Sequence, residues 1–262
     1  MQRNDMTVRQ RKLLHYQKSS KRNIEVNDTK YQPQTIVEVV FGNDESRLLI
    51  EDIVNGVLPF PFEGKTGILL YGTFGTGKTT LARLLPESIE MGQTGQPLAF
   101  DADFFGCQQG HTSTVIADTL KKQDKVLSFN ASGRNYYIFD EVDNLTKAAQ
   151  AGLKTTLNSP RGTFILTTNN ISQLDKGVKD RCVLVEMNAP QDSEFLPLAR
   201  RIATDENVVL NDTQLLAAIS GNNGSFRSVI FNVMRLAKRT AFKSKSASSI
   251  AVATIQQAAA KR

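Results

Sequence analysis

The sequence is poor in the residues that form disulfide, zinc and redox sites. It holds two cysteines and two histidines in 262 residues, and the spacing of Cys107, Cys182, His15 and His111 matches no metal site. We therefore expect free thiols. No apolar run approaches the roughly 20 residues of a membrane helix, and the first residues lack the apolar stretch of a signal peptide. These absences lead us to expect a cytoplasmic protein with no membrane partner.

Acidic residues are fewer than basic ones, 26 against 32, which gives a net charge of +6 and a pI of about 9.3. Such a balance favours polyanionic partners. Part of the excess lies in a basic N-terminal tail, which we place at residues 1–29 and in which Asp5 is the only acid among the first 22 residues. The basic residues of that stretch are Arg3, Arg9, Arg11, Lys12, Lys18, Lys21 and Arg22. Two interpretations stay open: a solvated disordered tail, or an arm that contacts nucleic acid phosphates or docks a partner.

A glycine-rich loop follows an apolar run in the segment ILLYGTFGTGKTT, residues 68–80. The pattern G-x-x-x-x-G-K-T between a strand and a helix predicts a phosphate-binding loop, because glycines let successive N–H groups turn toward phosphate oxygens. Lys78 would reach the β- and γ-phosphates, and the hydroxyl of Thr79 would hold Mg²⁺. The residues expected to bind the nucleotide here are Gly72, Gly75, Thr76, Gly77, Lys78, Thr79 and Thr80.

A second motif, NYYIFDEVDNL, places the apolar run 136–139 directly before two acids. This pattern is typical of a Walker B strand. Asp140 at the end of the strand would hold Mg²⁺ through its water shell, and Glu141 would orient or deprotonate the attacking water. The sequence therefore predicts a site for a nucleoside triphosphate, with Thr79 and Asp140 toward the metal.

The remaining pattern alternates strands and helices up to residue 187 and is helical afterwards. Strands are expected at residues 68–71, 97–103, 136–139, 161–170 and 182–187. Helices are expected at residues 46–60, 79–85, 112–123 and 145–158, the second of them ending at Pro86. We predict an α/β core over residues 30–187, a parallel sheet with helices on both faces, and a small all-helical domain over residues 188–262.

These motifs together resemble those of the AAA+ ATPases, and among them the small subunits of sliding-clamp loaders of the replication factor C type. The resemblance runs from about Lys30 to Leu236. It implies a P-loop NTPase core with a helical lid, ATP as the nucleotide and Mg²⁺ as the metal. The segment KYQPQTIVEVV is similar to the family's entrance motif, which implies that Tyr31, Val39 and Val40 surround the adenine.

The resemblance also implies roles in ATP hydrolysis for three further polar residues. Asn169, at the end of a strand, would contact the attacking water or the γ-phosphate. Arg181 would be a finger that reaches the ATP of a neighbouring subunit, although Asp180 stands where the family has Ser. Arg227 would be the second sensor, which links the lid to the γ-phosphate.

Other features depart from the family pattern. The sequence stops after the lid, whereas clamp-loader subunits usually continue into a helical collar. The segment AAQAGLKTTLN, residues 148–158, is similar to the family's central helix. In it, Lys154 stands at a position that is often Arg, and Asn158 stands where the family has Glu. The segment after the second strand is longer than in the family, and its Phe104-Phe105-Gly106 resembles the pore loops of protein-remodelling AAA+ rings, although packing under the sheet is an equal alternative.

The leading hypothesis is an ATP-hydrolysing switch in DNA replication, which assembles into a ring or spiral and grips primed or single-stranded DNA. A sliding clamp or a helicase is a candidate partner. DNA phosphates would be contacted by Thr112, Ser113, Thr114 and Lys154. Two alternatives stay open: a protein remodeller with an aromatic pore loop, and a nucleotide-dependent scaffold or helicase-loading adaptor with negligible turnover of ATP.

Overall fold

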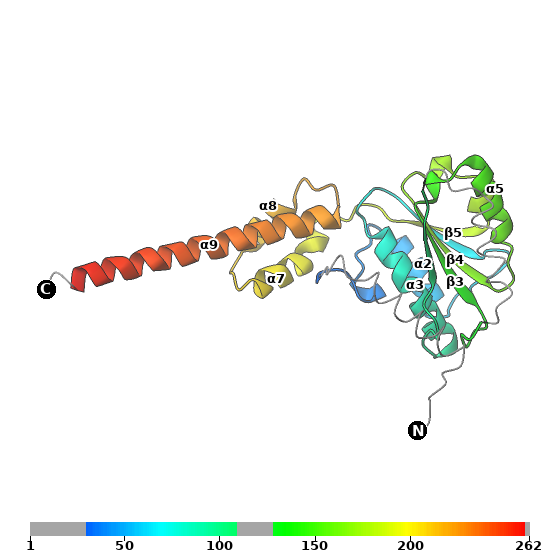
Figure 1. Ribbon diagram of the computed structural model, residues 1–262, viewed down its shortest axis with the longest axis horizontal. Coiled ribbons are helices and arrows are strands. Elements are labelled where there is room, and N and C mark those ends of the chain that lie inside the picture. Colours follow the sequence, from blue (N-terminus) through cyan, green and yellow to red (C-terminus); the bar gives the residue numbers. More distant parts are fainter. Residues whose placement is uncertain (1–29, 109–127, 260–262) are drawn as a thin grey trace, which may run out of the picture. The chain divides into compact units, whose positions relative to one another are not determined.

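Five parallel strands pair into one sheet in the order β2-β3-β4-β1-β5 within the described residues (Figure 1). The strands are β1 (Gly67–Tyr71), β2 (Asp103–Gly106), β3 (Asn135–Asp140), β4 (Gly162–Thr168) and β5 (Cys182–Glu186). The computed structural model describes residues 30–108 and 128–259, with side chains up to residue 244. Contacts divide the chain into two units, Met1–Gln32 and Pro33–Arg262, and all five strands belong to the second. The predicted parallel sheet is confirmed.

Helices cover both faces of the sheet, which explains why its central strands are apolar on both sides. Ile68 and Leu70 of β1 face a core built with α2 (Asp44–Val54) and α3 (Lys78–Thr94). Leu69 faces the opposite core, built with α5 (Lys147–Thr156) and α6 (Lys176–Asp180) (Figure 1). The sheet is therefore the middle of three layers, and its strand ends are free to carry polar side chains.

Helix α3 corrects the expectation that the helix after the glycine-rich loop ends at Pro86. It continues to Thr94 with Pro86 inside it. Leu81, Leu85 and Ile89 are fully buried at helical spacing on both sides of the proline, and burial of three such side chains outweighs a lost hydrogen bond. The helix ends instead at Gly95, which has a φ of 69°.

Strand β2 begins later than expected, at Asp103 rather than near residue 97. The reason is that side chains capture the preceding main chain: Leu98 N donates to Glu87 Oε2 and Ala99 N to Asn130 Oδ1, both at 3.0 Å. The shift places Phe104 and Phe105 inside the strand.

The structure therefore places these two phenylalanines in β2 rather than in a loop, and the pore-loop interpretation stays a prediction. Phe105 stacks on Phe139 of β3 with ring centroids 5.1 Å apart. Phe104, on the other side of the strand, lies under the guanidinium of Arg83 at 3.9 Å. Phe105 packs against the core, which agrees with the alternative of packing beneath the sheet, whereas Phe104 remains 38% exposed.

Helices make up the chain after β5, as expected. They are α7 (Leu196–Asp205), α8 (Asp212–Ile219) and α9 (Phe226–Ala259), and the first two pack on the third. Short 3-10 helices complete the described elements at Ile36–Glu38, Val142–Asn144, Ile171–Gln173 and Asp192–Phe195. Helix α9 continues to Ala259, the last residue that the structure describes. Among the described helices, none combines the length and the apolar character that crossing a membrane requires.

Candidate nucleotide-binding site

The loop between β1 and α3 has the geometry of an anion cradle. Gly72, Gly75 and Gly77 have φ angles of 144°, 79° and 90°, a region that favours glycine. A Cβ atom on Gly72 would also lie 2.4 Å from the carbonyl oxygen of Met187. The loop leads directly into the N-terminus of α3, where unpaired N–H groups and the helix dipole attract phosphate.

Two hydroxyl residues of the loop region have different tasks. Thr76 is buried, and its hydroxyl donates to the carbonyl of Thr73 at 3.0 Å, so this side chain braces the loop. Thr80 is half-buried in the first turn of α3. Thr76 would therefore contact the nucleotide through its main chain, because its hydroxyl is already bonded within the loop. The nucleotide contacts of Thr76 and Thr80 both stay predictions.

Lys78 is the first residue of α3 and is only 6% exposed. Its ammonium group donates to the carbonyl oxygens of Gly72 at 3.1 Å and Thr73 at 2.5 Å. The positive charge is thus held inside the curve of the loop, where phosphate oxygens would be cradled.

The surroundings of Lys78 bring several predicted residues to one place. Burial, the largest cause, lowers the pKa of Lys78 below its usual 10.5. The nearby carboxylates of Asp143 and Asp140 oppose that shift, and Glu141 does so more weakly. Arg227 lowers the pKa further because it is a second positive charge nearby. Acids from β3 and a cation from α9 therefore converge on the loop, although they are far apart in sequence.

Asp140 lies at the mouth of the loop and accepts two hydroxyl hydrogen bonds on the same oxygen. Thr79 Oγ1 donates to Asp140 Oδ1 at 2.8 Å, and Thr167 Oγ1 donates to it at 2.6 Å. A hydroxyl and one carboxylate fit Mg²⁺, which prefers oxygen ligands and takes the others from phosphates and water. The described residues hold no group of three or more His, Cys, Asp or Glu that would form an all-protein metal site.

Glu141 is exposed and has a left-handed backbone, with φ 59° and ψ 52°. This conformation is uncommon for a residue other than glycine. The main-chain N–H of Glu141 donates to Thr167 Oγ1 at 2.9 Å, and its carboxylate accepts from Asn144 Nδ2 at 3.2 Å. The turn thus leaves an exposed carboxylate on the residue next to Asp140.

Asp143 is a site residue that the sequence analysis missed. It is the strongest charged influence on Lys78, and its Oδ1 accepts from the main-chain N–H of Asn169 at 3.4 Å. The contact joins the predicted sensor at the end of β4 to the acidic turn after β3. The DEVD segment itself held the signal, since its last acid stands three residues after Asp140.

The start of α9 touches the loop directly. The main-chain N–H of Phe226 donates to the carbonyl of Gly75 at 3.0 Å, and a Cβ on Gly75 would lie 2.5 Å from Ser225 Oγ. Arg227 is the next residue and is exposed. Its positive charge lies near enough to Lys78 to lower the pKa of that lysine, and an exposed guanidinium at this place could meet an anion.

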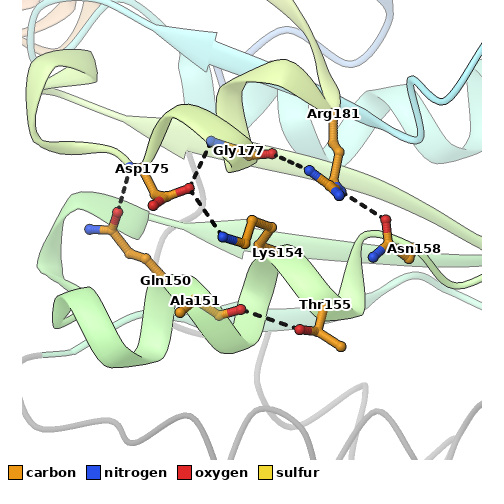
Figure 2. A network of polar contacts seen from close by, with 8 residues as sticks. All are labelled: Gln150, Ala151, Lys154, Thr155, Asn158, Asp175, Gly177 and Arg181. Carbon is orange, nitrogen blue, oxygen red and sulfur yellow. Dashed lines mark hydrogen bonds and ion pairs between the residues drawn. The ribbon is translucent and has the colours of Figure 1, made fainter.

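Arg181 lies at the opposite, amino-terminal edge of the sheet. Its carbonyl accepts from the main-chain N–H groups of Thr66 and Gly67, just before β1 begins, whereas the glycine-rich loop follows the end of β1. Its side chain donates to Asn158 Oδ1 from Nε at 2.8 Å and to the carbonyl of Gly177 from an Nη at 2.9 Å (Figure 2). The five residues of β1 separate the two places, about 16 Å at about 3.3 Å per residue.

The remaining predicted residues are not brought to the loop by any described contact. Val39 is buried in the same core cluster as Phe41 and Ile50, and Val40 is half-buried. Tyr31 belongs to the first unit of the chain. The adenine contacts therefore stay predictions.

Of the four predicted DNA contacts, Lys154 is described and forms an ion pair with Asp175 at 3.9 Å (Figure 2). Thr112, Ser113 and Thr114 lie outside the described residues. All four assignments stay predictions.

Comparison with known proteins supports the fold and shows which family the α/β core is similar to. Residues 68–188 match the family model described as "ATPase family associated with various cellular activities (AAA)". This segment of the chain is similar to AAA domains. It includes the glycine-rich loop, the acids after β3, Asn169 and Arg181, so every motif of the α/β site lies inside the matched segment.

The relatives found by sequence include replication factor C subunits, a group within the AAA+ proteins. Replication factor C small subunit 2 of Pyrobaculum islandicum is 26% identical over 213 residues, which cover 80% of this chain and 63% of that protein. Replication factor C small subunit of Picrophilus torridus is 29% identical over 215 residues, with coverage of 80% and 63%. The similarity to the clamp-loader group of AAA+ proteins is confirmed, and this chain spans about three fifths of the length of these relatives.

Solved structures support the fold alone. The RuvB Holliday junction branch migration motor of Thermotoga maritima is 18% identical, with a TM-score of 0.57 over 80% of this chain and 64% of that one. The AAA fold is thus found both by sequence and by structure.

Proposed function

We propose that this protein is an ATP-hydrolysing switch that acts on DNA during replication, in the manner of a clamp-loader small subunit. The observation that carries the proposal is the division of its charged side chains between the two edges of one sheet. Lys78, Asp140 and Glu141 gather at one edge, and Arg181 lies at the other. Relatives named replication factor C small subunits support the link to replication.

Within one subunit the residues divide the work as follows. The main chain of residues 72–77 and Lys78 bind the phosphates, and Glu141 orients a water and accepts its proton. Asn169, placed against Asp143, would hold that water or the γ-phosphate. Mg²⁺, when held by Thr79 and Asp140, neutralises charge that develops on the phosphate oxygens.

Arg181 would complete the site of a neighbouring subunit. Its separation from its own loop makes an action within the same subunit unfavourable, and a planar guanidinium suits phosphate recognition across an interface. We therefore expect self-association into a ring or spiral that encloses primed or single-stranded DNA. The division into a core of residues 30–187 and a helical lid of residues 188–262, linked through Arg227, belongs to this proposal.

ATP hydrolysis with and without primed DNA tests the proposal, with Lys78→Ala as the control that lacks the phosphate-binding lysine. Strong stimulation by DNA supports it. Negligible turnover under all conditions, with ATP-dependent binding of a partner protein, would favour a scaffold or helicase-loading adaptor instead. Mass measurement of the complex with a non-hydrolysable ATP analogue and primed DNA then gives the number of subunits.

A further inference from the structure

The hydroxyl of Thr167 joins the two acids of the site. It donates its proton to Asp140 Oδ1 at 2.6 Å and accepts from the main-chain N–H of Glu141 at 2.9 Å. Thr167 is 1% exposed, near the carboxyl end of β4, and comes from a different strand than the acids. Neither the glycine-rich loop nor the DEVD segment contains it.

The two hydrogen bonds of Thr167 restrain two different groups, the carboxylate of Asp140 and the main chain of Glu141. The bond to Asp140 orients a carboxylate that also accepts from Thr79, and in the described residues both hydroxyls meet the same oxygen. The bond from Glu141 supports a left-handed residue, a conformation that persists where the surroundings hold it. One side chain therefore sets the direction of the metal-facing carboxylate and the turn that carries the base.

We propose that Thr167 is a positioning residue that aligns Asp140 for Mg²⁺ and fixes the main chain of Glu141 for water activation. This inference rests on the proposed ATPase function of the same site. A hydrogen-bonded carboxylate presents its remaining lone pairs to a metal in one direction, and loss of such a support costs about 10- to 100-fold in metal affinity or activity. A buried hydroxyl on a β-branched side chain is suited to this task because few rotamers compete.

The chain offers a matched control on the same strand. Thr163 lies four residues earlier on β4, so its side chain points to the same face of the sheet. It is fully buried, and within the described part of the chain its hydroxyl has no hydrogen-bond partner. Thr163→Val and Thr167→Val thus make the same chemical change at two buried sites, and only the second removes contacts to the acids.

The test compares Thr167→Val, Thr167→Ser and Thr163→Val in the full chain. Binding of a fluorescent ATP analogue is titrated with Mg²⁺, and we expect the half-saturating Mg²⁺ concentration to rise about tenfold or more in Thr167→Val. Analogue binding in EDTA stays unchanged, because the phosphate-binding loop is intact. Thr167→Ser restores the Mg²⁺ response, and Thr163→Val leaves it at the level of the unmodified protein.

Hydrogen exchange gives a readout that needs neither nucleotide nor turnover. The amide of Glu141 should exchange at least about fivefold faster in Thr167→Val, the ratio that a typical hydrogen bond corresponds to. Thr163→Val should not change it. An unchanged Mg²⁺ response and unchanged exchange in Thr167→Val, or equal changes in both valine variants, overturn the inference.

The outcomes also separate this inference from the proposed function. If the unmodified protein hydrolyses ATP and Thr167→Val behaves identically, the positioning role fails and the ATPase stands. If the unmodified protein hydrolyses no ATP and Thr167→Val still weakens the Mg²⁺ response, hydrolysis fails and the positioning role stands.

Discussion

The two edges of the parallel sheet differ in the partners of their charged side chains. At the carboxyl-terminal edge, Lys78, Asp140 and Asp143 lie close together and shift the lysine pKa. At the amino-terminal edge, Arg181 is held by neutral partners, the amide of Asn158 and the carbonyl of Gly177 (Figure 2). The first edge thus gathers the residues of the proposed catalytic site, whereas the second holds a cation whose hydrogen-bond partners among the described residues are neutral. Under the proposed function, a subunit built in this way needs a neighbour.

The largest effect should come from Arg181→Ala. We expect ATP turnover of the assembled protein to fall by about 10³-fold or more, the usual worth of an arginine finger. Nucleotide affinity of the isolated subunit should not change, because Arg181 lies at the far edge from the loop. Turnover and analogue binding measure the two quantities.

Lys179→Ala changes a cation at the end of α6, two residues before Arg181, and serves as the control that should retain turnover. Mixing Arg181→Ala with a Lys78 variant should restore part of the activity, since some interfaces then combine an intact loop with an intact arginine. Full turnover by Arg181→Ala alone would refute the division between the two edges.

Lys78→Met should act on the other edge, with a loss of about 10²- to 10³-fold in turnover, comparable to removal of one preorganised donor. The same change should raise the free energy of unfolding of the nucleotide-free protein by about 1 kcal/mol, because a buried charge at a functional site costs stability. Thermal unfolding at neutral pH checks the sign. A less stable Lys78→Met protein would show that the two carbonyl contacts outweigh the burial.

The lowered pKa of Lys78 also predicts a pH dependence. Between that lowered pKa and 10.5, the folded state binds fewer protons than the unfolded chain, so stability rises with pH in this window. Below the window the cost of burying the charge is fully present. The difference in unfolding free energy between Lys78→Met and the unmodified protein should therefore shrink as the pH approaches 10.5.

A smaller effect is expected from Asn158→Asp. An aspartate would pair with Arg181 and compete with the phosphate of a neighbour, and an exposed ion pair is worth up to about 1 kcal/mol, or roughly fivefold in turnover. Thr155→Asp places the same charge on the exposed side of α5 and is the control. If both variants lose the same amount of activity, the neutral side chain of Asn158 does not affect the action of Arg181.

The smallest expected effect is on the alkylation rates of the two cysteines, one near each edge of the sheet. Burial, the largest cause in each case, raises the pKa of both Cys107 and Cys182 to about 12, so both should resist alkylation at about pH 8 in the folded protein. The main-chain N–H of Cys107 donates to the carbonyl of Asp140 at 2.8 Å. A bound ATP analogue should therefore slow labelling of Cys107 and leave Cys182 unchanged, whereas equal protection would indicate opening of the whole fold.

Much of the site was predictable because its residues belong to short motifs with local physical causes. A tight phosphate loop needs positive φ angles, which glycine supplies, and a metal-facing acid follows directly from an apolar strand. Asp143 and Thr167 escaped prediction for another reason. Their partners, Asn169 and Asp140, lie on neighbouring strands, and no local pattern states which hydroxyl or amide will meet which carboxylate.

The errors in the fold have the same origin. Pro86 is locally typical of a helix end, yet buried apolar side chains on both sides, Leu85 before it and Ile89 after it, carry α3 through it. Residues 97–102 have the pattern of a strand, yet Glu87 and Asn130 take up their main-chain groups. Tertiary contacts outweighed local preference in both places.

The sequence by itself determined the phosphate loop, the acidic turn and the alternation of strands and helices, because main-chain geometry and burial periodicity act over a few residues. The tertiary structure decided which edge of the sheet each charge occupies, since that depends on the strand order β2-β3-β4-β1-β5. Strand order follows from packing over the whole domain. For that reason the separation of Arg181 from Lys78, on which the need for a neighbour depends, became visible only in the folded chain.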